Sequence, residues 1–190
     1  MHIDLANWYK PNIERKELKK LSKRKDWPGL LHFFVYFFSL FLSGYFAYAT
    51  WGTWWTFFWF FIYGSIYAFS VSNWHETVHR TAFRTRWINE IFYHISSFMC
   101  DFEGFRWRWS HTFHHTYTMQ TEGNYDHEIQ ISRPTELFWF FMNFIPFSDL
   151  LYPHRLLKFE VLKHAFGYLS PVVKISAPNN QKKKIIWNSR

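Results

Sequence analysis

The feature that most constrains this fold is an uncharged stretch of 42 residues, Leu30 to Val71, without a single Asp, Glu, Lys or Arg. As one straight helix it would be about 63 Å long, roughly twice the ~30 Å hydrocarbon core of a bilayer. One spanning helix is therefore too long, and two fit. Trp27-Pro28-Gly29 marks a break before the stretch, and Thr50-Trp51-Gly52-Thr53 supplies a turn within it. We predict two transmembrane helices, over 30–49 and 54–72.

Basic residues lie directly before this stretch and set its expected orientation. They are Lys10, Arg15, Lys16, Lys19, Lys20, Lys23, Arg24 and Lys25. Because cations beside a membrane span mark the cytoplasmic side, we expect a cytoplasmic amino terminus and a helical hairpin that returns the chain to that side. The formal charge of +8 could also indicate nucleic acid. Its position beside the apolar stretch argues against a nucleic-acid partner.

The expected fold class is all-α: a membrane protein with a two-helix transmembrane hairpin, followed by cytoplasmic or interfacial helices. We divide the chain into a basic amino-terminal segment (1–29), the hairpin (30–72), a region of interfacial helices (73–170) and a polar tail expected to be disordered (171–190). The apolar segment 137–151 is too short to span a bilayer and contains Pro146. It is predicted to be an interfacial or re-entrant helix.

Two compact histidine clusters follow the apolar stretch, and both are predicted to face the cytoplasm. The first is His75-Glu76-Thr77-Val78-His79, and the second is His111-Thr112-Phe113-His114-His115. On a helix, residues i and i+4 share one face, and each cluster contains such a histidine pair. Neutral imidazole suits iron, zinc or copper, and a chain with one cysteine lacks the ligands of a Cys-based zinc site. The predicted metal ligands are His75, His79, His111, His114 and His115.

These clusters and their flanking residues resemble the integral-membrane fatty acid desaturase superfamily, with its related hydroxylases. The resemblance is carried by Asn73-Trp-His-Glu-Thr-Val-His-Arg-Thr-Ala-Phe83 and Trp107-Arg-Trp-Ser-His-Thr-Phe-His-His-Thr116, which are similar to bacterial members. It covers roughly residues 30–170. It implies a non-haem oxidoreductase that holds two irons through eight or more histidines in three boxes, activates O2 and removes two hydrogens from an acyl chain.

The resemblance also implies the partners. The substrate would be a membrane lipid or another acyl chain, and an external donor of the ferredoxin or cytochrome b5 type would supply electrons. By the same resemblance the five cluster histidines are iron ligands, and no catalytic residue is expected beyond them. Breaking an unactivated C–H bond lies beyond protein side chains, so a metal must supply that chemistry.

One part of the family pattern is missing. The third box, His/Gln-x-x-His-His after a further membrane hairpin, does not occur in these 190 residues. We therefore interpret the chain as a form truncated before that box, with enough histidines for one metal and an incomplete two-iron site. The histidines outside the clusters and the first span have no near histidine partner, so we expect surface or hydrogen-bonded roles for His94, His127, His154 and His164. A structural role is expected for His32, inside the first span.

Two further sets of side chains lie near the clusters. One set could accept the second N–H of ligating imidazoles or form ordinary surface ion pairs. Its members are Glu76, Asp101, Glu103, Asp126 and Glu128. The other set could hold a lipid phosphate, a coenzyme A group or an electron donor, or could simply anchor the chain at the interface. It comprises Arg80, Arg84, Arg86, Arg106 and Arg108, with Trp87, Trp107 and Trp109.

Two alternative functions stay open. The first cluster also fits H-E-x-x-H, the signature of zinc metalloproteases in which the glutamate, here Glu76, acts as general base. A membrane-embedded protease would leave the second cluster without a role. The other alternative is a non-catalytic, truncated membrane protein that binds lipid or pairs with a full-length relative. Metal analysis separates the enzymes, since a desaturase needs iron and the protease needs one zinc.

Overall fold

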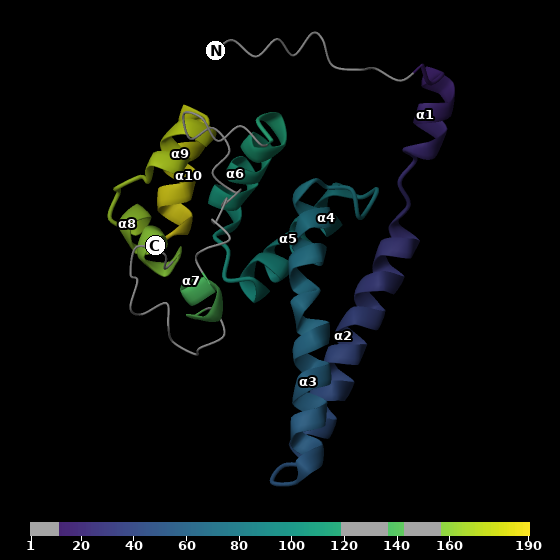
Figure 1. The fold of residues 1–190 in the computed structure, drawn as a ribbon. Coiled ribbons are helices and arrows are strands. Elements are labelled where there is room, and N and C mark those ends of the chain that lie inside the picture. Colours follow the sequence, from purple (N-terminus) through teal and green to yellow (C-terminus); the bar gives the residue numbers. More distant parts are fainter. Residues whose placement is uncertain (1–11, 119–136, 143–156) are drawn as a thin grey trace. The chain divides into compact units, whose positions relative to one another are not determined.

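The computed structural model describes residues 12–118, 137–142 and 157–190, and every regular element within those residues is a helix (Figure 1). The all-helical class predicted from the sequence is confirmed for them. The chain divides into two compact units, Met1–Tyr67 with His79–Glu90 and Ala68–Val78 with Ile91–Arg190. Each unit is described separately.

The helices are assigned to the units as follows. The first unit contains α1 (Arg15–Leu21), α2 (Asp26–Ala49) and nearly all of α3 (Trp54–Ala68). The second contains α4 (Ser70–Val78), α6 (Gly104–Thr116), α7 (Leu137–Met142), α8 (Leu157–Ala165), α9 (Pro171–Ser176) and α10 (Asn179–Asn188). Helix α5 (Arg86–Met99) begins in the first unit and continues into the second.

Two antiparallel helices, α2 and α3, form most of the first unit (Figure 1). Helix α2 buries one stripe of residues spaced three and four apart: Phe33, Tyr36, Leu40, Ser43 and Ala47. The rings of Phe46 and Trp59 stack with centroids 4.6 Å apart and join the two helices. Between them, Gly52 has a φ of 83°, the left-handed region that glycine enters without steric cost. The turn lies where the sequence predicts it.

Helix α2 begins at Asp26, four residues before the predicted start at residue 30. Trp27-Pro28-Gly29 therefore lies in its first turn, and the break comes before that turn. A proline is tolerated at this position because the first amide groups of a helix have no intrahelical acceptor to lose.

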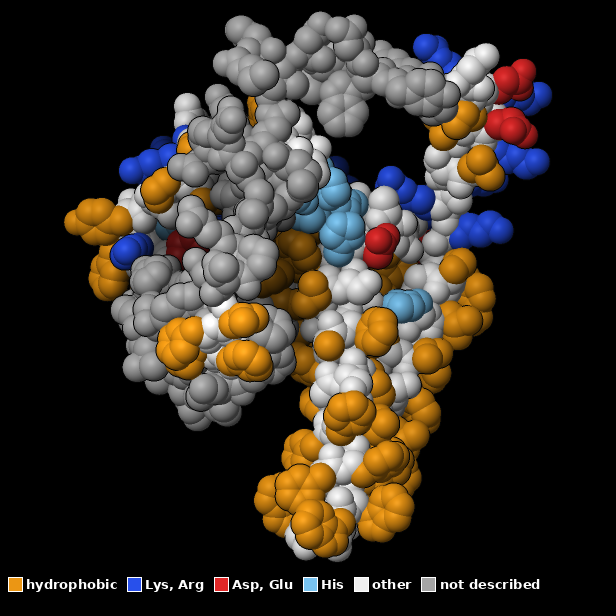
Figure 2. All heavy atoms as spheres, in the orientation of Figure 1, with side chains coloured by type: hydrophobic (Ala, Val, Ile, Leu, Met, Phe, Trp, Pro, Cys, Tyr) orange, Lys and Arg blue, Asp and Glu red, His pale blue; other side chains and the backbone are white. Residues whose placement is uncertain are grey.

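Arg15–Ala49, which comprises α1 and α2, is the one helical stretch of the described residues long and apolar enough to cross a membrane. Only 28% of its most apolar window is buried, whereas the core helix of a soluble protein would be mostly buried. Figure 2 shows the resulting apolar surface along α2 and α3. Helix α3 has 15 residues, fewer than the ~20 of a spanning helix, because a turn at Phe69 separates it from α4. The second transmembrane helix, over 54–72, stays a prediction.

The loop after α4 docks on the first turn of α2, within the first unit. The Asp26 carboxylate accepts hydrogen bonds from the Thr85 backbone N at 2.8 Å and from its Oγ1 at 2.7 Å. Phe83 is fully buried and stacks on Phe33 with centroids 5.6 Å apart. A Cβ at Gly29 would lie 2.5 Å from a backbone carbonyl oxygen of this loop. The chain can come this close only because residue 29 has no side chain.

The carboxyl-terminal segment forms helices α9 and α10, so the prediction of a disordered tail over 171–190 is wrong for these helices. Val173, Ala177 and Ile185 are buried together, and Phe105 and Trp109 of α6 pack against them. The segment is polar overall, and its apolar residues are too few and too widely spaced to show a periodic pattern. Composition therefore did not predict these helices. The tail therefore supports α6.

Helix α7 covers residues 137–142 of the interfacial helix predicted over 137–151. The side chains of Leu137, Phe138 and Phe141 are exposed, and the interfacial or re-entrant placement of this helix stays a prediction. The remaining residues of that prediction lie outside the described part of the chain.

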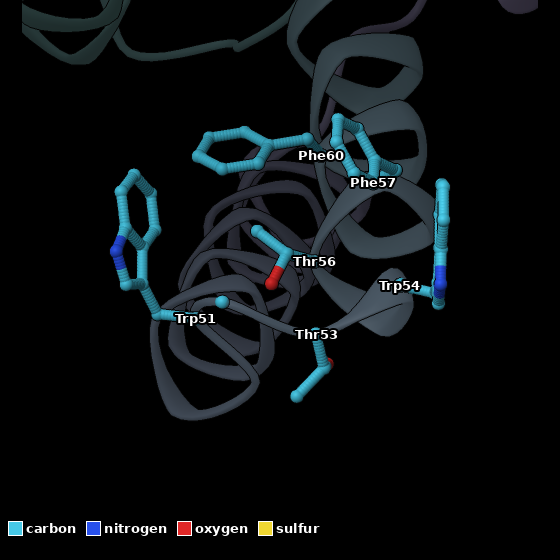
Figure 3. A pocket seen from close by; sticks show the side chains of 7 residues that line it. Trp51, Thr53, Trp54, Thr56, Phe57 and Phe60 are labelled. Atoms are coloured by element: carbon cyan, nitrogen blue, oxygen red, sulfur yellow. The ribbon is translucent and has the colours of Figure 1, made fainter.

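An open apolar hollow lies at the turn between α2 and α3 (Figure 3). Its lining consists of Trp51, Gly52, Thr53, Trp54, Thr56, Phe57 and Phe60. None of these side chains is an acid, a base or a metal ligand at neutral pH. The hollow therefore offers no group for acid–base or metal chemistry.

Gly29→Ala should destabilise the first unit by about 1–3 kcal/mol, the usual cost of overpacking, because the new methyl group would overlap the Ala82 carbonyl oxygen. Thermal unfolding in detergent, followed by tryptophan fluorescence, would show a lower Tm. Gly64→Ala is the matched control, since nothing lies within 4 Å of a Cβ there. Equal Tm values for the two variants would contradict the close approach at Gly29.

Ile185→Ala should loosen α10 and cost about 2–5 kcal/mol, as for other large-to-small changes in a core, because Ile185 is fully buried. Limited proteolysis should then cleave the carboxyl-terminal segment faster than in the unaltered protein. The exposed neighbour Lys184 provides the control variant Lys184→Ala. If both variants were cleaved at the rate of the unaltered protein, the packing of α10 would be refuted.

Candidate metal centre

Helix α4 positions the first histidine cluster. Its buried side includes Trp74, Thr77 and Val78, and the half-buried His75 lies next to Trp74. His79 is the first residue after α4, one helical turn beyond His75. Arg80 then ends the helical conformation with a φ of 57°, which is uncommon outside glycine. The short helix thus presents His75 and His79 on one side, as their spacing predicts.

Helix α6 positions the second cluster, and Glu103 caps its amino end. The Glu103 carboxylate accepts hydrogen bonds from the backbone N of Phe105 and of Arg106. Burial raises the pKa of the Glu103 carboxyl, and these hydrogen bonds oppose that rise. His111 lies in the second half of the helix and is only 5% exposed.

Trp74 joins the two helices that carry the histidines. Its ring meets the His111 ring edge to face at a centroid distance of 5.1 Å. It also contacts Phe102 at 5.0 Å and Trp107 at 6.0 Å, again edge to face. Tyr93 of α5 packs in the same cluster, and its hydroxyl donates a hydrogen bond to the Gly104 carbonyl. Burial raises the pKa of Tyr93 to about 12, so the hydroxyl stays protonated and keeps donating.

Four histidines offer nitrogen atoms that lie within 4.8 Å of one another: His75, His79, His111 and His115. Three of them belong to the second unit, and the fourth, His79, follows α4 directly. The Nε2 atoms of His111 and His115 are 3.1 Å apart. The His75 ring centroid is 4.9 Å from that of His111 and 5.9 Å from that of His115. The side chains therefore converge on one small volume.

These separations fit a single metal ion. Metal–imidazole bonds of about 2.0–2.1 Å, as for zinc, place two ligand nitrogens about 3 Å apart at a right angle and about 4.2 Å apart across the ion. The 3.1 Å between the His111 and His115 nitrogens matches the right-angle case. The upper limit of 4.8 Å for the whole group is within a small side-chain adjustment of the opposite case. The four histidines could hold a metal.

His114 is the predicted ligand that the group of four leaves out. Its ring stacks beside His111 at a centroid distance of 5.6 Å. Successive residues on a helix diverge by about 100°, so His114 and His115 cannot both point the same way. Metal binding by His114 stays a prediction.

The acids near the clusters have different environments. His75 Nδ1 lies 3.5 Å from Glu76 Oε1, so Glu76 is placed to orient this ring. Glu103 serves as the cap of α6 and also accepts a hydrogen bond from Asn188 of α10. Asp126 and Glu128 lie outside the described residues.

The arginines and tryptophans named from the sequence fall into two groups. In the second unit they are internal: Arg106 is buried and pairs with Glu160 at 3.2 Å, and the Arg108 guanidinium lies 4.0 Å from the centre of the Tyr93 ring. In the first unit Arg84, Arg86 and Trp87 are exposed. Of the arginines and tryptophans in this set, Arg84, Arg86 and Trp87 are therefore the ones available to a lipid or a protein partner.

Of the histidines outside the clusters, His94 and His164 fit the surface or hydrogen-bonded roles expected of them. His164 is fully buried, and its Nε2 accepts a hydrogen bond from the Ser170 backbone N at 3.2 Å. Burial lowers the pKa of His164 and favours the neutral ring that can accept this bond. His94 is exposed, and so is His32. His127 and His154 lie outside the described residues.

Sequence reasoning missed the residues that hold the cluster together. Trp74 lies inside the quoted motif but was not given a role, and Tyr93 was not singled out. A signal was present, because Trp74 lies beside His75 and is four residues before Val78, as expected for the buried face of a helix. The partner residues on α5 and α6 could not be paired with it from spacing alone.

Comparison with known proteins gives one match. The family model described as "Fatty acid desaturase" matches residues 52–188, a range that contains both histidine clusters and the whole of α10. No curated protein and no solved structure matches the chain.

Trp74→Leu should weaken the metal centre without removing a ligand, because His111 loses the ring that supports it. Loss of positioning partners around a metal ligand typically costs 10–100-fold in affinity, and about that loss is expected when Co²⁺ binding is titrated by absorption spectroscopy. Trp187→Leu is the matched control, since Trp187 is exposed on α10. Unchanged Co²⁺ affinity in Trp74→Leu would exclude this supporting role.

Proposed function

The chain belongs to the fatty acid desaturase family, and we propose that it is a non-haem iron oxidoreductase that acts on acyl chains with O2. The observation that carries the proposal is the convergence of His75, His79, His111 and His115 on one volume. The family match supports the same proposal, because residues 52–188 include all four. His114 completes the proposed ligand set.

Iron bound by these imidazoles would activate O2 for abstraction of hydrogen from an acyl chain. The protein's own residues would hold the iron and orient its histidine ligands. His111 has its ring almost entirely out of water, between Trp74 and the His75 ring. Glu76 lies beside His75 Nδ1 and favours the tautomer with a proton on that nitrogen, which leaves Nε2 free to ligate. Trp74, Phe102 and Trp107 exclude water from one side of the cluster.

An acyl chain is the substrate class that best suits this protein. The family is membrane-associated, and α2 with α3 exposes aromatic and aliphatic side chains along its length. We place the basic amino terminus and both histidine clusters on the cytoplasmic side, by the charge distribution before α2. A soluble donor of the ferredoxin or cytochrome b5 type would deliver electrons from that side.

The number of iron ions bound per chain is the quantity that tests this proposal most directly. Five histidines suffice for one iron, whereas the two irons expected of the family need further ligands. Metal analysis of the purified protein therefore bears on both the identity and the number of the ions. One zinc per chain in place of iron would favour the metalloprotease alternative.

His111→Ala should abolish stoichiometric iron binding, because it removes the most buried ligand from the group. Elemental analysis of protein loaded with Fe²⁺ under anaerobic conditions measures the effect. His94→Ala is the control: it also replaces a histidine on a helix of the second unit, but His94 lies outside the group. Equal iron content in the two variants would overturn the proposed centre.

Glu76→Gln separates the two enzyme classes. In a protease it removes the general base and abolishes peptide hydrolysis, while zinc remains bound. In the proposed oxidoreductase it only weakens the orientation of His75. The expected outcome is no peptide hydrolysis by either protein, together with partial retention by Glu76→Gln of whatever lipid desaturation the unaltered chain shows with an electron donor. Peptide hydrolysis lost in Glu76→Gln would refute the proposal.

A further inference from the structure

A cationic surface forms where two distant segments meet in the first unit. The Asp26–Thr85 hydrogen bonds, 2.8 and 2.7 Å long, bring Lys25-Asp26-Trp27 against Arg84-Thr85-Arg86. Lys25 and Trp27 flank one partner of these hydrogen bonds, and Arg84 and Arg86 flank the other. The sequence places these segments almost sixty residues apart, so their meeting is visible only in the fold.

Most cations of this surface are not neutralised by ion pairs within the described part of the protein. Lys23, Lys25 and Arg86 form no ion pair with a carboxylate in the described residues. Arg80, by contrast, is paired with Glu90 at 2.7 Å. The acid of these two segments, Asp26, accepts the hydrogen bonds from Thr85, and its charge also interacts with that of Arg84. We call Lys23, Lys25, Arg84 and Arg86 the cationic clamp.

Exposed aromatic and aliphatic residues border the clamp. Trp27 is 70% exposed and Trp87 is 64% exposed, one beside each of the joined segments. Leu30 and Leu31, one turn further along α2, are also exposed. Tryptophan favours the headgroup region of a bilayer, and apolar side chains favour the acyl region below it. A ligand that carries both a phosphate and an acyl chain would therefore find cations for the phosphate and apolar side chains for the acyl chain on this one surface.

We propose that the cationic clamp binds an anionic membrane phospholipid, with the headgroup phosphate on Lys25, Arg84 and Arg86 and the acyl chains along the exposed start of α2. An acidic soluble protein would satisfy the charges alone. The exposed leucines and tryptophans favour the lipid, because they would lie unused in water beneath a soluble partner. The proposed lipid site includes none of the clustered histidines and does not depend on metal.

Lipid retention by the full chain tests this site. The protein is purified in detergent containing equal amounts of phosphatidylglycerol and phosphatidylcholine, and the lipid that co-purifies is quantified by mass spectrometry. The unaltered protein should retain phosphatidylglycerol preferentially. Arg84→Gln/Arg86→Gln should lower that preference by roughly thirtyfold, given the usual contribution of two cations near a membrane surface. High salt should lower it as well.

Two variants control for charge and folding. Lys183→Gln/Lys184→Gln removes the same charge from exposed positions of α10 and should keep the preference. Arg84→Lys/Arg86→Lys keeps the charge and should retain most of it. The proposal fails if the glutamine pair at 84 and 86 keeps its preference, or if both glutamine pairs lose it equally. The proposal would also be overturned if the unaltered protein showed no preference between the two lipids and instead bound an acidic soluble protein through the clamp.

Discussion

The contact between Trp74 and His111 is the interaction on which the candidate site depends. The histidines come from two helices separated in sequence, and an imidazole cannot by itself hold two helices in register. A buried indole can, because aromatic pairs add about 0.5–1.5 kcal/mol each beyond the area they bury. Trp74 makes four such contacts, with Tyr93, Phe102, Trp107 and His111. His75 and His111 are thus positioned by the apolar cluster around Trp74.

The grouping of the four histidines could be predicted from sequence because a helix converts residue spacing into side-chain direction. The pairs His75/His79 and His111/His115 each require only one helical turn, and the structure places all four together. His114 shows the limit of the same reasoning, since spacing of three residues is compatible with binding but does not determine it. The partners of Trp74 were beyond prediction, because they depend on how three helices pack.

The fold shows the same division between local and long-range information. The uncharged stretch and its turn at Gly52 follow from composition and were located correctly, whereas the meeting of Asp26 with Thr85 joins segments far apart in sequence. The carboxyl-terminal helices were missed for a different reason. Ile185 is buried by Val173 and by residues of α6, so a segment that looks polar in isolation is ordered by its neighbours. Composition is a property of one segment, whereas burial depends on the other segments that pack against it.

Helix α5 extends the argument for a membrane beyond the apolar stretch. From Ile91 onward the small polar residues Ser96 and Ser97 are buried, while Ile91, Ile95 and Phe98 are exposed, the last of them at 86%. Water would favour the reverse arrangement, since burial of apolar side chains is the main force that orients a surface helix. A helix with its apolar stripe outward suits a lipid surface. A family of membrane enzymes that acts on acyl chains needs such a surface, and α5 leads directly into the helix that carries His111.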